Sequence, residues 1–146
     1  MTVIGAGIMG LYLIVAAFTD IKMKYLNHWF LLAGIIPAIL LRVGVGSMSI
    51  PDTVGGLVLG AFFVAASWFS GGRLGKADGI ILLYLGVALG FTGAATLAVI
   101  AFFLSALVMI VLMLMKKITM KGSIPFVPFL LAAYIPVMFL QAGSRV

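Results

Sequence analysis

Long apolar stretches separated by short polar interruptions run through the whole chain. Except for the fourth, each stretch approaches the roughly 20 residues that an α-helix needs to cross a bilayer. The pattern therefore predicts six transmembrane helices, at residues 1–19, 29–45, 53–70, 78–90, 94–115 and 124–141.

Glycine and proline mark where the last three stretches begin, end or bend. Gly90 and Gly93 predict a tight turn between the fourth and fifth helices, because glycine tolerates backbone angles that other residues resist. Pro125 and Pro128 fall in the first turns of the sixth helix, and Pro136 predicts a kink within it.

The composition agrees with this pattern. Apolar residues make up 65% of the chain and charged residues 8%, far below the roughly 25% charged residues of soluble domains. We therefore expect an all-α, polytopic membrane protein in which residues 1–146 form a single membrane-embedded domain. The chain has no cysteine and one histidine, His28, so we expect no thiolate or histidine metal site and no cofactor.

The basic residues indicate an orientation. With the N-terminus outside, seven of the nine Lys and Arg residues fall in cytoplasmic loops, as the positive-inside rule requires. The net charge of +6 is spread over these loops, so we expect no nucleic-acid partner. The seven cytoplasmic residues are Lys22, Lys24, Arg73, Lys76, Lys116, Lys117 and Lys121, and Arg42 and Arg145 stay outside.

Two of the three acidic residues fall on the predicted cytoplasmic side. Asp20 follows the first helix and Asp78 opens the fourth, whereas Asp52 lies in an outer loop. Acids beside membrane-spanning sequence are costly and point to function, and two carboxylates that meet can share a proton as in aspartic proteases. Structural roles stay open: Asp78 could cap its helix, and Asp20 could be an interfacial anchor balanced by Lys22.

The short fourth helix suggests that Asp78 is recessed. Residues 78–90 cover roughly 20 Å, against a hydrocarbon core of about 30 Å. We therefore expect Asp78 up to roughly 10 Å below the cytoplasmic surface, beneath irregular backbone supplied by Gly71, Gly72 and Gly75. Gly55, Gly56 and Gly60 form a glycine-rich helix face, which could pack within the protein or against a substrate helix.

Three segments together resemble the type IV prepilin peptidases, a family of Gly-x-Gly-Asp membrane aspartic peptidases. Residues 20–27 (DIKMKYLN) resemble the first motif of that family, residues 75–78 (GKAD) the second, and residues 124–130 (IPFVPFL) the C-terminal signature. The three occur in the family's order and span nearly the whole chain. The chain departs from the pattern where Leu26 replaces a proline and where Ala77 and Val127 replace glycines.

The resemblance implies an aspartic endopeptidase of the cytoplasmic (inner) membrane with its site on the cytoplasmic side. It would remove the basic leader of prepilins or pseudopilins, which become the expected partners beside the lipid bilayer. Asp20 and Asp78 would jointly activate water. Supporting residues would be Asn27, Gly75, Lys76, Ala77, Pro125 and Pro128. Methyltransferase activity is not implied, because the cysteine-bearing insertion of larger members is missing.

Two other classes of function stay open. In a small proton- or cation-coupled transporter, Asp20 or Asp78 would be the coupling carboxylate. In a non-catalytic scaffold of a pilus or secretion machine, the substitutions at Leu26, Ala77 and Val127 would mark a decayed site. The oligomeric state is open.

Overall fold

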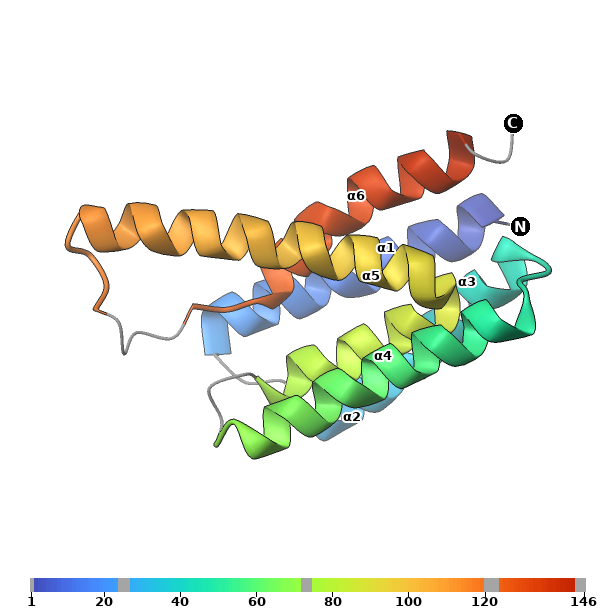
Figure 1. Ribbon diagram of the computed structural model, residues 1–146, viewed down its shortest axis with the longest axis horizontal. Helices are drawn as coiled ribbons and strands as arrows, with labels where there is room; N and C mark the ends of the chain where they lie inside the picture. The colour runs from blue at the N-terminus through green and yellow to red at the C-terminus, as the bar shows by residue number, and fades with distance from the viewer. Residues whose placement is uncertain (1, 24–26, 72–74, 120–123, 144–146) are drawn as a thin grey trace.

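A computed structural model describes residues 2–23, 27–71, 75–119 and 124–143, and their regular secondary structure is entirely α-helical (Figure 1). The helices are α1 (Thr2–Met23), α2 (His28–Ala33), α3 (Ile35–Val45), α4 (Ile50–Phe69), α5 (Lys76–Leu114) and α6 (Val127–Gly143). Several residues used above for orientation and motifs lie outside the described residues: Lys24, Leu26, Gly72, Arg73, Lys121 and Arg145.

Four helical stretches are long and apolar enough to cross a membrane: Val3–Met23, His28–Val45, Ile50–Phe69 and Lys76–Leu114. α6 is also apolar but shorter. The expected all-α architecture is therefore confirmed, with helix lengths and composition compatible with a multi-pass membrane protein.

Three helix boundaries differ from the predicted ones. α1 continues to Met23, so Asp20 lies within its last turn rather than after it. The second predicted helix is divided at Gly34 into α2 and α3, because Pro37 has no N–H to bond the carbonyl one turn earlier. α6 begins at Val127, later than the expected position 124, so Pro125 precedes it.

The turn predicted over residues 90–93 is longer than the observed one. A single residue, Gly90, reverses the chain with φ 75° and ψ −176°, and helix resumes at once. α5 thus consists of a first limb (residues 76–89) and a second limb (residues 91–114), and Figure 1 shows the second limb turning back along the bundle. Asp52 holds this reversal, because its carboxylate accepts hydrogen bonds of 3.2 Å from both the N–H and the hydroxyl of Thr92.

The glycine-rich face of α4 packs inside the protein. Gly56 and Gly60 are buried against the first limb of α5, and a methyl group on Gly56 would overlap the carbonyl of Gly86. The same group on Gly60 would overlap the backbone of Leu83. Small residues let two helices approach this closely in a membrane, so this face is not open to a substrate helix.

Candidate active site

The two aspartates predicted as a pair lie at the same end of the bundle. Asp20 lies in the last turn of α1 and Asp78 in the first turn of α5. Both side chains are half-buried, and their carboxyl groups are close enough to interact electrostatically. Asp52 belongs to the opposite end, where it caps the second limb of α5 at Thr92.

Asp78 is held by the start of its own helix. Gly75 is the N-cap residue of α5, which makes Asp78 the third helical residue. The Asp78 carboxylate accepts a hydrogen bond from the backbone of Gly75, and the Gly75 carbonyl accepts one from the Asp78 N–H at 3.1 Å. This is one half of a capping box. A methyl group on Gly75 would collide with Asp78 Oδ2, so the carboxylate rests directly on glycine backbone.

Asp20 is held by the start of a different helix. Its Oδ2 accepts a hydrogen bond of 3.4 Å from the backbone N–H of Val127, the first residue of α6. Pro128 has no N–H, so Val127 is the only donor among the first two residues of the helix. An acid at the C-terminus of its own helix is unfavourable, but here Asp20 also faces the positive end of α6.

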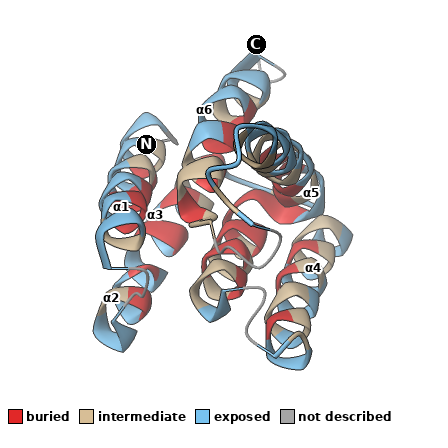
Figure 2. Cartoon of the chain, turned by 90° about the vertical axis from the view of Figure 1, so that its left-hand side faces the viewer, coloured by how far each residue is buried: buried red, intermediate tan, exposed pale blue. Residues whose placement is uncertain are grey.

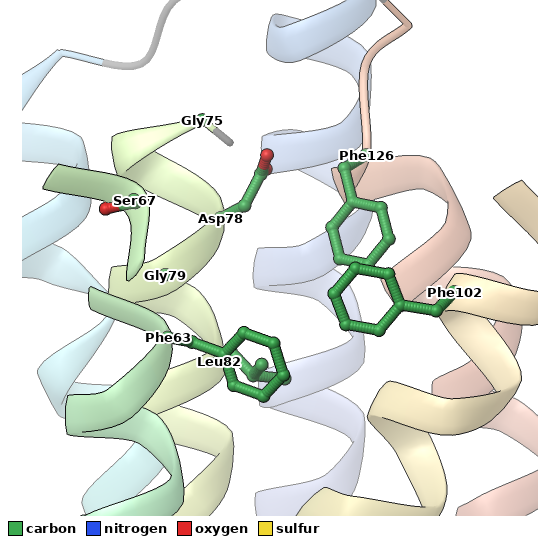
Figure 3. Close-up of a pocket in the computed structure, with 8 residues that line it drawn as sticks. All are labelled: Phe63, Ser67, Gly75, Asp78, Gly79, Leu82, Phe102 and Phe126. Carbon is green, nitrogen blue, oxygen red and sulfur yellow. The ribbon is translucent and has the colours of Figure 1, made fainter. Parts of the chain in front are cut away.

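A small cavity lies against Asp78, between α4, both limbs of α5 and the start of α6. It has room for about one water molecule. In Figure 3 the Asp78 carboxyl group and the ring of Phe126 face the same space, whereas the hydroxyl of Ser67 points away. Ser67 donates to the Val64 carbonyl at 2.7 Å, so Asp78 supplies the polar chemistry of this cavity.

Three phenylalanine rings form one wall of the cavity. The ring of Phe102 stacks on Phe63 of α4 with centroids 5.5 Å apart, and it lies 4.8 Å from the ring of Phe126. Phe102 therefore joins three parts of the bundle: its own second limb of α5, helix α4 and the start of α6.

The remaining predicted supporting residues do not line the cavity. Lys76 is exposed at the first position of α5, and Ala77 packs its methyl group against the core. Asn27 occupies the N-cap of α2 but makes no capping hydrogen bond with its side chain. Within the described segments, neither Asn27 nor Lys76 is hydrogen-bonded or ion-paired to either aspartate.

Two features of the site were not anticipated. The first is the hydrogen bond from the Val127 N–H to Asp20. The prolines at positions 125 and 128 do mark the start of a helix, where some backbone N–H groups lack partners within the helix. The second is the wall of Phe63, Phe102 and Phe126, since nothing in an apolar sequence distinguishes rings that line a cavity from rings that face lipid. Across the described part of the chain, no group of three or more carboxylate or imidazole side chains is placed to hold a metal ion.

Comparison with the models of known protein families, with curated protein sequences and with solved structures finds no match to this chain.

Proposed function

We propose that this protein is a membrane aspartic endopeptidase that removes the basic leader of prepilins or pilin-like proteins at the cytoplasmic face. One observation carries the proposal. Two carboxyl groups from helices far apart in the sequence, Asp20 and Asp78, are close enough to interact electrostatically at one end of an apolar bundle, and Asp78 lines a cavity of water size. The resemblance of the three motifs to those of the type IV prepilin peptidases indicates the class of substrate.

The chemistry would follow from two carboxyl groups that share one proton. The ionised member takes a proton from water, and that water attacks the scissile carbonyl. The protonated member donates its proton to the carbonyl oxygen, which gives a tetrahedral diol. When the diol collapses, the C–N bond breaks, the leaving amine takes the proton that the first acid accepted from water, and one hydroxyl returns a proton to the other acid. Because the groups are coupled, we assign the pair jointly rather than naming one as the base.

The supports of the two acids suit this chemistry. Asp20 is held by the N–H of Val127 and Asp78 by the backbone of Gly75, so both carboxylates are positioned by backbone groups rather than by flexible side chains. Because these backbone groups are already in place, the two carboxylates do not have to be reoriented during the reaction.

We propose six membrane crossings with the N-terminus outside. The reversal at Gly90 supports counting the two limbs of α5 as separate crossings. The acid pair would then face the cytoplasm together with Lys22, Lys76, Lys116 and Lys117.

The site would lie below the cytoplasmic surface. From Gly90, the first limb covers roughly 18 Å to Asp78, and the second limb roughly 36 Å to Leu114. If Gly90 lies at the outer boundary of a hydrocarbon core about 30 Å thick, Asp78 lies roughly 12 Å short of the inner boundary. A recess at that depth keeps the acids near the membrane-embedded part of a substrate.

A non-catalytic scaffold is the second candidate, and one observation favours it. Each acid already has a structural task, because Asp78 caps α5 and Asp20 caps the start of α6. Capping alone would account for both positions without any reaction.

Asparagine substitutions separate the two candidates. Asn keeps a side-chain oxygen that can accept the same backbone hydrogen bond, but it cannot exchange a proton. The chain is co-expressed with a single-span protein that carries a basic leader, a glycine and an apolar helix, and leader removal is followed by gel shift. The peptidase proposal expects Asp20→Asn and Asp78→Asn to abolish removal in a folded protein, whereas Asp52→Asn retains it. Removal that survives either of the first two substitutions contradicts the proposed pair.

A further inference from the structure

Exposed lysines lie at the end of the bundle that carries the acid pair. Lys22 is in the last turn of α1 and Lys76 is the first residue of α5, so each stands two residues from one of the aspartates. Lys116 and Lys117 follow the C-cap of the second limb of α5. Figure 2 looks onto this end and shows the ends of α1 and of the second limb coloured as exposed. We call Lys22, Lys76, Lys116 and Lys117 the four lysines, and the side chain of each is exposed.

The chain has little negative charge with which to balance these lysines. Its acidic residues are Asp20, Asp52 and Asp78, and Asp52 lies at the opposite end of the bundle. Two carboxyl groups that share one proton carry a single negative charge between them. The end of the bundle with the acid pair is therefore basic while the pair is in its working form.

Two of the four lysines occupy positions that are unfavourable for their own helix. Lys76 puts a cation at the N-terminus of α5, which is the positive end of the helix dipole. Lys116 has φ 55°, a left-handed conformation in which glycine is the usual residue after a helix. Its N–H donates to the Met113 carbonyl at 3.0 Å. The Lys117 N–H donates to the Leu112 carbonyl, also at 3.0 Å, which completes a Schellman ending. Local structure therefore does not explain a lysine at either position.

On the proposed topology, the second limb reaches the headgroup layer of the cytoplasmic leaflet. It covers roughly 36 Å from Gly90 to Leu114, about 6 Å more than the hydrocarbon core. Lys116 and Lys117 would therefore lie among the lipid phosphates. The anionic lipids of that leaflet attract basic residues near the membrane surface.

We propose that anionic phospholipid headgroups bind to the four lysines and hold the basic leader of the substrate beside the acid pair. The inference rests on the proposed function and adds a lipid partner to it. Its main support is charge, because a basic leader that approaches this end meets four lysines, and a single shared negative charge does not offset their repulsion. Apart from the pair, the chain has only Asp52, at the far end, to attract the leader. Lipid phosphates between the lysines and the leader neutralise both.

The depth of the acid pair determines which part of the leader can meet the headgroups. On the proposed topology, Asp78 lies roughly 12 Å short of the inner boundary of the hydrocarbon core. An extended chain covers about 3.3 Å per residue, so about four residues of the substrate span this distance. Basic residues farther than this from the scissile bond reach the lipid phosphates, and their charge is the charge that should matter.

The test uses the full-length chain in vesicles with two single-span probe proteins. One probe has a basic leader, and in the other each leader Lys or Arg beyond that four-residue distance is replaced by Gln. The vesicles hold phosphatidylcholine alone or phosphatidylcholine mixed with phosphatidylglycerol, and KM is expressed per lipid. We expect phosphatidylglycerol to lower the KM for the basic leader at least fivefold, since an anionic surface contributes about that factor for each basic residue. The KM for the neutral leader should not change, and in phosphatidylcholine alone it should be the lower of the two.

Two results of this test overturn the proposal. The first is a lower KM for the basic leader in phosphatidylcholine alone, because groups of the protein would then attract the leader. The second is an equal effect when inorganic phosphate replaces phosphatidylglycerol, because free anions would then be sufficient.

Substitution of the lysines tests their part directly. In a chain with Lys22→Gln, Lys116→Gln and Lys117→Gln, the KM for the basic leader should fall in phosphatidylcholine, because the repulsion is weaker. The gain from phosphatidylglycerol should also shrink. The matched control carries Arg at the same three positions and should behave like the unsubstituted chain. A fall in KM is not an effect of misfolding, and an unchanged KM in both kinds of vesicle overturns the proposal.

A lipid-binding measurement separates the lipid partner from the peptidase. The chain is extracted in detergent from the mixed vesicles, and the ratio of the two lipids that it retains is measured. Phosphatidylglycerol should be enriched several-fold over the bulk ratio on the unsubstituted chain and much less on the glutamine variant, and equal enrichment overturns the contact with the lysines. Cleavage of both leaders without any response to phosphatidylglycerol overturns the proposal and leaves the peptidase intact. Enrichment without cleavage of either probe contradicts the peptidase and, with it, the binding of a leader by lipid.

Discussion

The carboxylate of Asp20, near the C-terminus of α1, accepts a hydrogen bond from the N–H of Val127 at the N-terminus of α6. Two segments 107 residues apart in the chain are joined by this contact. It gives Asp20 the positive helix end that its own helix lacks. It also places the C-terminal IPFVPFL segment beside Asp20, at the start of α6.

The first prediction concerns this hydrogen bond. Val127→Pro removes the N–H, and proline is well suited to the first position of a helix. The matched variant, Val127→Ala, keeps the N–H and shortens the buried side chain. Both variants should lose stability through the smaller side chain. On the proposed function, cleavage by Val127→Pro should fall about fivefold below that of Val127→Ala, because the N–H that positions Asp20 is lost and a hydrogen bond contributes roughly 1 kcal/mol. Equal rates of leader removal in the two variants would show that the hydrogen bond does not matter for activity.

The second prediction concerns the glycine beneath Asp78. Gly75→Ala places a methyl group against Asp78 Oδ2, so the carboxylate must move. A displacement of about 1 Å at a reacting group can lower a rate roughly 100-fold, and we expect a loss of that order. The control is Gly7→Ala, where an added methyl group meets nothing within 4 Å. Normal cleavage kinetics in Gly75→Ala would mean that Asp78 need not hold this position.

The sequence predicts those parts of the fold that depend on local pattern. Apolar stretches and their polar interruptions locate the helix ends to within a few residues when α2 and α3 are taken together, because the length of an apolar run is a local property of the sequence. The break at Gly34 was missed, although its cause, Pro37, is visible in the sequence. A proline within an apolar run loosens the preceding turn even where the run is otherwise continuous.

Contacts between distant segments could not be predicted. The reversal at Gly90 occupies a single residue because Asp52, 40 residues before Thr92, caps the helix that follows. The motifs and the charge pattern predict Asp20 and Asp78 on one side of the membrane, but neither shows how near their carboxyl groups lie. That separation depends on how α1 and α5 each pack on α3 and α6, which residue spacing along the chain does not encode.

The third prediction concerns the packing of α4 on α5. Gly56→Ala forces a methyl group into the carbonyl of Gly86, so the helices must separate. Overpacking of this kind costs roughly 1–3 kcal/mol, and we expect a lower Tm in detergent, followed by circular dichroism. In Gly10→Ala the new methyl group meets Tyr134 at an ordinary 3.6 Å, and the Tm should be unchanged or higher. Similar Tm values for the two variants would contradict this close approach.

The last prediction concerns Asp52, the acid that lies away from the pair. Its carboxylate caps the second limb of α5 at Thr92, so Asp52→Ala should lower the free energy of unfolding by about 1 kcal/mol. Asp52→Asn keeps an acceptor oxygen and should lose less. Both variants should remove the leader at the normal rate below their Tm, because the cap holds the fold at the opposite end from Asp20 and Asp78. A folded Asp52→Asn protein without activity would instead place Asp52 in the reaction, and the pairing of Asp20 with Asp78 would no longer explain the chemistry.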